Sequence, residues 1–248
     1  MLRKFQVKGV GPASKRVNNR ELADVVPGLG DPRKVVLYDD FLGSSLDGAW
    51  SGASGSDGSD PAIQDGEVGG VVRLATGGGT SGFSSNLSAL AHGRNFRADN
   101  GEALVGGRLA IDTVAHSYIF IGFTDDTGAE LPFTLDSDGN LTANASDAVG
   151  ILMDTTYDEN FHAVGVAGDS TVSPVALGVG PADGEWIVPE VVVRETGAAV
   201  MHVDRGRVAS LASAVSADVA LTPVVVASDD NEGTRNLDVD WLLAVGER

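Results

Sequence analysis

The chain contains no cysteine among its 248 residues. A disulfide framework and thiolate chemistry are therefore excluded. A chain of this length can bury a core that needs no such cross-link, and a single β domain of more than about 200 residues is ordinary. The absence of cysteine fits assembly inside a cell and does not exclude later exposure outside it, so the compartment stays open.

Long apolar runs are also missing. No stretch approaches the roughly 20 consecutive apolar residues that a membrane span needs. The chain begins M-L-R-K-F-Q-V-K-G, which carries charge but is not followed by an apolar run of signal length. The sequence therefore predicts a soluble chain without a secretory signal and without a membrane partner.

Lysine is absent after Lys34, and the charge is divided unevenly. Residues 1–34 hold eight basic and three acidic residues, a balance of +5, whereas residues 35–248 hold nine arginines and 32 acidic residues, a balance of −23. We therefore divide the chain into a basic N-terminal arm, residues 1–34, and an acidic body, residues 35–248. Nucleic acid is not a predicted partner, because its phosphates repel an acidic body.

Glycine and proline interrupt the arm, so it cannot form one long helix. Its few large apolar side chains cannot offset the entropy cost of ordering it alone. Two interpretations stay open: a solvated terminus, or an arm that docks on an acidic protein surface. For docking, the candidate partner-binding residues are Arg3, Lys4, Phe5, Lys8, Lys15, Arg16 and Arg20.

Short apolar segments separated by turn signals fill the body. An opening strand starts near Val35, a Gly/Ser/Asp loop follows from Gly43 through Asp60, and candidate strands cover residues 68–76, 107–115, 117–124, 131–135, 148–153, 161–167, 186–195, 198–204, 223–228 and 237–245. No sustained helical period occurs between them. Because parallel sheets need crossover helices, this pattern predicts an all-β fold, an antiparallel β-sandwich with an extended N-terminal arm.

Two of these strands have distinctive patterns. Residues 117–124 are apolar on both faces, which predicts a strand in the middle of a sheet that is covered on both sides. In the last strand, Leu237, Val239, Trp241, Leu243 and Val245 alternate with polar residues in its first half. Side chains of a strand point to opposite faces in turn, so these five are predicted to face the core.

Catalytic motifs are missing. Glycoside cleavage needs two carboxylates that flank one bond, and an E-x-D-x-E run that would supply them from one strand is absent. Asp238 and Asp240 share a face of the last strand, which is more simply a solvated face. No G-x-S-x-G and no G-x-x-x-x-G-K occurs. We therefore predict no catalytic residues and a chain that is not an enzyme.

Metal-binding patterns are weak, and no cofactor is predicted. The four histidines stand without a second ligand at zinc spacing. Asp136, Asp138 and Asn140 place three oxygen-bearing side chains at alternate positions around a glycine, which makes them weak calcium candidates. The run lacks the downstream bidentate glutamate of a full calcium loop, so a simple turn is the preferred interpretation.

Tryptophan occurs three times, at Trp50, Trp186 and Trp241. Exposed rings of this kind could form a platform on which sugars stack. Trp241 has the phase of the core, and the sequence does not determine the exposure of the other two.

Five motifs occur in a suggestive order: Y-D-D-F-L-G before Trp50, G-G-V-V-R-L-A-T-G-G, Y-I-F-I-G-F-T-D-D, V-M-H-V-D-R-G-R-V, and the closing L-D-V-D-W-L-L-A-V-G-E-R. Their order resembles that of tailed-bacteriophage virion proteins with a concanavalin-like jelly roll, over residues 38–248. One departure is at Asp204 to Gly206, where the family has an Asp-Gly turn and this chain inserts Arg205.

The resemblance implies a structural role and brings no catalytic residues. It predicts a capsid decoration or cement protein of the virion, assembled in the host cytoplasm. Such a protein would bind the major capsid protein lattice through its arm as a homo-oligomer, with a trimer as one option. The alternative is a carbohydrate-binding head or tail module for host attachment, with a glycan as its partner.

Overall fold

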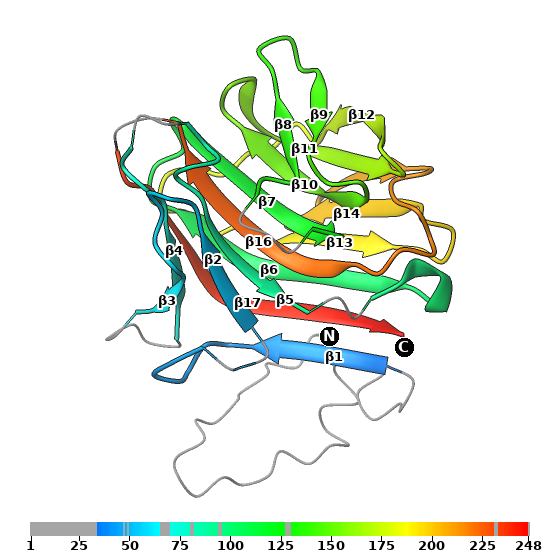
Figure 1. The fold of residues 1–248 in the computed structure, drawn as a ribbon, viewed down its shortest axis with the longest axis horizontal. Coiled ribbons are helices and arrows are strands. Elements are labelled where there is room, and N and C mark those ends of the chain that lie inside the picture. Colours follow the sequence, from blue (N-terminus) through cyan, green and yellow to red (C-terminus); the bar gives the residue numbers. More distant parts are fainter. Residues whose placement is uncertain are drawn as a thin grey trace, which may run out of the picture.

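The computed structural model describes residues 34–247 except 47, 49, 65–69, 80–81, 94–95, 127–129 and 231–232, and the side chain of Arg207 is also outside the description. Figure 1 shows two antiparallel sheets packed face to face, with a small hairpin at one end. The one helical element in the described part is a short 3₁₀ helix, Ala98–Asn100. The predicted all-β antiparallel sandwich is confirmed.

Sheet A has the order β15-β14-β13-β6-β17-β4-β3, and β1 pairs with β17 beyond the end of β4. Its strands are β1 (Lys34–Asp39), β3 (Ala62–Ile63), β4 (Val72–Ala75), β6 (Ala103–Ile111), β13 (Pro189–Val193), β14 (Ala199–Val203), β15 (Arg207–Leu211) and β17 (Asn236–Glu247). Lys34, counted with the arm from its charge, is the first residue of β1.

Sheet B has the order β12-β11-β10-β7-β16-β5-β2. Its strands are β2 (Trp50–Ser54), β5 (Ser88–His92), β7 (Ser117–Thr124), β10 (Ala148–Asp154), β11 (Asp158–Ala167), β12 (Ser170–Ala176) and β16 (Thr222–Asp229). A separate hairpin joins β8 (Phe133–Leu135) to β9 (Leu141–Ala143).

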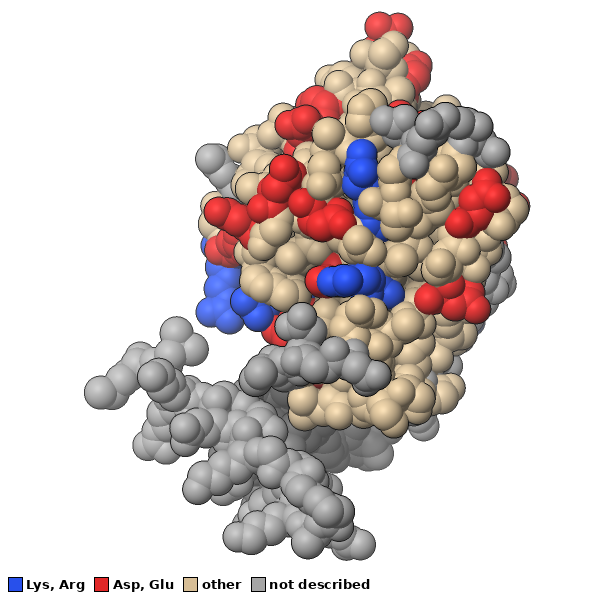
Figure 2. Space-filling model, turned by 90° about the vertical axis from the view of Figure 1, so that its left-hand side faces the viewer, with Lys and Arg blue, Asp and Glu red and all other residues tan. Residues whose placement is uncertain are grey.

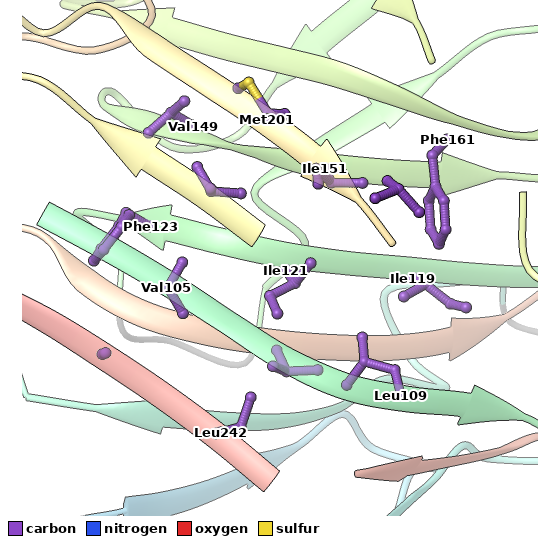
Figure 3. Packing of buried hydrophobic residues seen from close by; sticks show 14 of the residues in the cluster. Val105, Leu109, Ile119, Ile121, Phe123, Val149, Ile151, Phe161, Met201 and Leu242 are labelled. Atoms are coloured by element: carbon purple, nitrogen blue, oxygen red, sulfur yellow. The ribbon is translucent and has the colours of Figure 1, made fainter. Parts of the chain in front are cut away.

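The core lies between the two sheets. Figure 3 shows side chains of β6, such as Val105 and Leu109, facing Ile119 and Ile121 of β7. Large aliphatic and aromatic side chains interdigitate there, and burying one of them stabilises the fold by roughly 1.5 to 3 kcal/mol. Strand β7 lies between β10 and β16, and all eight of its residues are buried. The prediction that this strand is central and covered on both faces is confirmed.

The phase predicted for the last strand is wrong in its second half. Leu237 and Val239 are buried as predicted, but Trp241 and Leu243 are half-exposed, and Leu242 is buried in place of Leu243. The pairing of β17 with β6 shifts register between Val239 and Trp241, which is a β-bulge. Asp240 is the extra residue, so every later side chain faces the side opposite to strict alternation.

Two further expectations need correction. The predicted loop from Gly43 through Asp60 contains β2, the edge strand of sheet B. The sequence analysis also missed β3, β5, β9, β12 and β15, which are short or polar and carry little periodic signal. The β14–β15 turn is tight although Arg205 interrupts the Asp-Gly pair, because Asp204 and Arg205 both adopt positive φ.

Candidate functional site

The outer face of sheet B is covered. A second hydrophobic cluster lies on it, formed by side chains of its strands and of the β8–β9 hairpin, including Phe120, Phe133, Leu135 and Leu152. The packing is close: a Cβ placed on Gly150 would lie 2.4 Å from Cε2 of Phe120. Figure 1 shows the hairpin standing beside β10 and β11. A ligand therefore has no access to this part of sheet B without displacing the hairpin.

Two buried groups hold the hairpin in place. The Tyr118 hydroxyl on β7 donates a hydrogen bond of 3.0 Å to the carbonyl of Phe133. The buried carboxylate of Asp154 on β10 accepts hydrogen bonds from the backbone N–H groups of Leu135, at 2.8 Å, and Thr156, at 3.0 Å. Both contacts satisfy backbone groups that burial would otherwise leave without a partner.

The outer face of sheet A is more open. Along β13 and β14 buried residues alternate strictly with half-buried ones, so each strand presents every second side chain to the outside. Three aromatic side chains from distant segments lie on this face: Tyr38 of β1, Trp186 before β13, and Trp241 of β17. Tyr38 is 54% exposed and Trp186 is 38% exposed. We call these three residues the outer aromatic group.

Strand pairing explains how the outer aromatic group is positioned. Tyr38 pairs with Leu243, and Trp241 lies two residues earlier on the same face of β17. Trp241 pairs with Arg108 of β6. An isolated bridge between Leu109 and Ile187 places both of these side chains in the core and turns the preceding residues, Arg108 and Trp186, outward.

Arg108 connects the aromatic and acidic side chains of this face. Its guanidinium carbon lies 4.4 Å from the centroid of the Trp186 ring, which is a cation–π contact. Its Nη1 also donates a hydrogen bond of 2.7 Å to Oδ2 of Asp240, the bulge residue. The bulge therefore supplies the carboxylate that holds Arg108 against the ring.

Other basic side chains on this face also have acidic partners. Arg73 of β4 forms a bidentate pair with Asp238, at 2.7 and 2.8 Å. Lys34 lies 3.9 Å from the carboxylate of Glu247. Asp238 and Asp240, predicted to form a solvated face, are thus each fixed by an arginine.

The field around Tyr38 is negative. Partial burial raises the pKa of the Tyr38 hydroxyl, and the nearby carboxylates of Asp40, Asp240 and Asp39 raise it further. At neutral pH the hydroxyl is therefore protonated and available as a hydrogen-bond donor. An aromatic ring next to fixed carboxylate and guanidinium groups can stack on an apolar ring face and bond to hydroxyl groups.

One of the three tryptophans is buried, and the other two lie on the outer face of sheet A. Trp50 is buried in the core and makes an edge-to-face contact with His92, with ring centroids 5.5 Å apart, so it cannot join a surface platform. Trp241 was predicted to face the core and faces outward, because of the bulge. The combination of Trp186, Arg108 and Asp240 was missed entirely, and no local sequence signal links them.

The candidate calcium residues lie in the turn between β8 and β9. Oδ1 of Asp136 accepts hydrogen bonds from the backbone N–H groups of Asp138 and Asn140, and Oδ2 accepts one from the Asn140 side-chain amide. These hydrogen bonds, first that of the Asn140 side chain, lower the pKa of Asp136. The turn is thus closed by its own groups.

The candidate partner-binding residues all lie in residues 1–33, which are outside the described residues: Arg3, Lys4, Phe5, Lys8, Lys15, Arg16 and Arg20.

Within the described ranges, no group of three or more histidine, aspartate or glutamate side chains is arranged to hold a metal ion. The same residues contain no helix with the length and apolar character of a membrane span.

Acidic side chains are spread over the described surface. Figure 2 shows the end of the sandwich at the left of Figure 1, where β2, β3 and β4 lie, with red carboxylate groups around its rim and fewer blue basic groups between them. This agrees with the negative balance of residues 35–248.

No protein-family model matches the sequence, and no curated protein matches it. Solved structures do share the fold. An endo-β-1,4-glucuronan lyase from the fungus Trichoderma reesei is 13% identical with a TM-score of 0.59, and covers 86% of this chain and 95% of its own. The β-glucanase of Bacillus licheniformis is 12% identical with a TM-score of 0.54, over 86% and 98% of the two chains. Peanut lectin is 12% identical with a TM-score of 0.52, over 86% and 97%.

These comparisons define the fold class: the protein is a concanavalin-like jelly roll. They correct the prediction that the chain is not an enzyme, because two of the three structures named here are enzymes, a lyase and a glucanase. The missing E-x-D-x-E run therefore does not exclude catalysis. The virion role implied by the sequence resemblance stays a prediction, since none of these three structures is named as a virion protein.

Proposed function

We propose that this protein is a glycan-recognition domain that binds its ligand on the outer face of sheet A. The observation that carries the proposal is the outer aromatic group, whose outward-facing rings lie beside the hydrogen-bonding side chains of Arg108 and Asp240. The fold supports the proposal, because it is shared with a lectin and with enzymes named for glucan and glucuronan. The part of the outer face of sheet B that packs against the β8–β9 hairpin is covered by it and closed to a ligand.

Affinity electrophoresis of the full chain in gels that contain soluble polysaccharides tests the proposal. A bound polysaccharide retards the chain, and Trp186→Ala or Trp241→Ala should weaken that retardation. One lost stacking contact of about 1 kcal/mol corresponds to roughly a fivefold weaker Kd. Trp50→Phe is the matched control, since Trp50 lies in the core, and should bind like the unmodified protein.

Binding and cleavage are separated by a second measurement. The retarding polysaccharide is incubated with the protein, and newly formed chain ends are measured. Formation of ends would make the glycan a substrate of this chain, whereas binding without new ends would describe a lectin-like domain. Equal binding by Trp186→Ala, Trp241→Ala and the unmodified protein would refute the outer face as the site.

The capsid role remains a separate prediction. It depends on the basic arm, residues 1–34, and on the acidic body. One virion protein could bind glycan through its body and attach to the capsid through its arm. Observed glycan binding would therefore not decide the capsid role, which needs a binding measurement on virus particles.

A further inference from the structure

The charges on the outer face of sheet A deepen the proposed function, on which this inference rests. We infer that this face takes a glycan without carboxylate or sulfate groups, and that Asp240 sets this preference by neutralising Arg108.

The first step concerns the cations next to the aromatic rings. Arg108 is the cation in contact with Trp186, and its guanidinium is hydrogen-bonded to Asp240 at 2.7 Å. The next arginine along the face, Arg73, is held by both oxygens of Asp238. A guanidinium recognises an anionic sugar through a bidentate fork to its carboxylate or sulfate. On this face, Asp238 occupies the fork of Arg73, and Asp240 pairs with Arg108 through one hydrogen bond that offsets its charge.

The second step concerns the remaining charges. Burial and then the negative charges of Asp40, Asp240 and Asp39 raise the pKa of Tyr38, so a further negative charge beside it is disfavoured. Glu190, which pairs with His202, is also on the outward side of β13. An acidic glycan would bring like charges together and lose hydration, and Arg108 and Arg73, the described arginines nearest to the rings, are already paired with aspartates. A neutral glycan has no anionic group to be repelled or dehydrated. It can still stack on the rings, and its hydroxyl groups can donate hydrogen bonds to the carboxylates.

The third step concerns Asp240 itself. Alternation from the buried Val239 places the Asp240 side chain on the outer face, where its carboxylate accepts a hydrogen bond from Arg108, the residue that contacts the Trp186 ring. Asparagine has nearly the same shape and can still accept a hydrogen bond from Arg108, but it carries no charge. Asp240→Asn should therefore keep the cation–π contact and leave a positive charge beside the ring.

Affinity electrophoresis tests the inference with a panel of probes. The neutral members are barley mixed-linkage β-glucan, xyloglucan and galactomannan; the acidic members are glucuronan, alginate and chondroitin sulfate. We expect the unmodified chain to be retarded by at least one neutral member and by no acidic member, with little effect of salt. Asp240→Asn should gain at least fivefold in retardation by an acidic member, and 0.5 M NaCl should remove the gain.

The control has the same change of charge elsewhere. Asp99 pairs with Arg97 at 2.6 Å, next to the end of β6 that is far from Arg108, so Asp99→Asn also releases an arginine. It should gain no binding to acidic members. If Asp240→Asn does not fold, Asp238→Asn takes its place as the test variant, because it releases Arg73 on the same face. The preference of the unmodified chain for neutral glycans is measured without either variant.

The outcomes separate the inference from the proposed function. Stronger retardation of the unmodified chain by acidic than by neutral members would overturn the inference and leave glycan binding intact. A neutral preference that is unchanged in Asp240→Asn and Asp238→Asn would overturn the role of the aspartates. No retardation by any member would overturn the proposed function itself.

Discussion

Trp241 pairs with Arg108, whereas Val239, two residues earlier, pairs with the adjacent Leu109, so Asp240 is an extra residue in β17. Strand β17 pairs with β4 before this point and with β1 after it. The bulge lies where β17 changes its neighbour, and it turns Trp241 to the outer face, the side on which alternation already places Asp240.

The bulge predicts that two deletions in β17 destabilise the fold to very different extents. Deleting Asp240 removes the extra residue and leaves Leu242 and Ala244 facing the core, so we expect cooperative thermal unfolding with a small loss of stability. Deleting Leu243 moves Ala244 outward and Val245 inward, which exchanges the buried and exposed sides at a cost of several kcal/mol. Circular dichroism on heating distinguishes the two, and equal losses would contradict the bulge.

Arg108 is expected to hold the Trp186 ring. In a chain with Trp50→Phe and Trp241→Phe, Trp186 is the single tryptophan, and adding Arg108→Gln should increase the quenching of its fluorescence by acrylamide. The lost cation–π contact should cost about 0.5 to 1 kcal/mol in urea unfolding, since the site is partly exposed. Arg73→Gln removes the other paired arginine of this face and should leave the quenching unchanged. Unchanged quenching in Arg108→Gln would show that the ring is held by other contacts.

Asp154 is expected to fasten the β8–β9 hairpin. Asp154→Ala leaves the buried N–H of Leu135 without its acceptor, so we expect a loss of about 1 to 3 kcal/mol and faster hydrogen exchange in residues 133–143. Asp136→Ala is the matched control, because Asp136 also accepts backbone hydrogen bonds but is exposed. Its effect should be smaller and confined to the turn. Equal exchange in both variants would argue against the anchoring role of Asp154.

Tyr118 is expected to make the protein sensitive to alkali. Burial raises the pKa of Tyr118 well above its usual range, and the Asp154 carboxylate adds to this. A pKa that is higher in the folded state gives stability that is fully present below the unfolded-state pKa of about 10 and is lost as the pH rises above it. The thermal midpoint should therefore fall above about pH 10.

Tyr118→Phe tests this prediction. The variant loses the hydrogen bond to Phe133 and should be less stable at neutral pH. It has no hydroxyl to ionise at this position, so its thermal midpoint should fall less steeply above about pH 10. An identical alkaline slope in both proteins would assign the sensitivity to other groups.

The sequence by itself determined what depends on neighbouring residues. The apolar run 117–124 forms the central strand covered on both sides, as predicted, and the candidate strand 198–204 contains β14, in which Ala199, Met201 and Val203 alternate into the core. Both patterns can be recognised within one short segment, because successive side chains of a strand point to alternate faces of the sheet. Composition alone also established the acidic body and the absence of disulfides.

Only the tertiary structure decided the candidate site. Arg108 and Asp240 are 132 residues apart, and Arg73 and Asp238 are 165 residues apart. Their contacts depend on which strands pair, in which register, and on one bulge. A single extra residue reverses the facing of every later side chain, and alternation within one strand contains no information about that register. For this reason the sequence placed Trp241 in the core, and the fold places it on the surface beside Arg108.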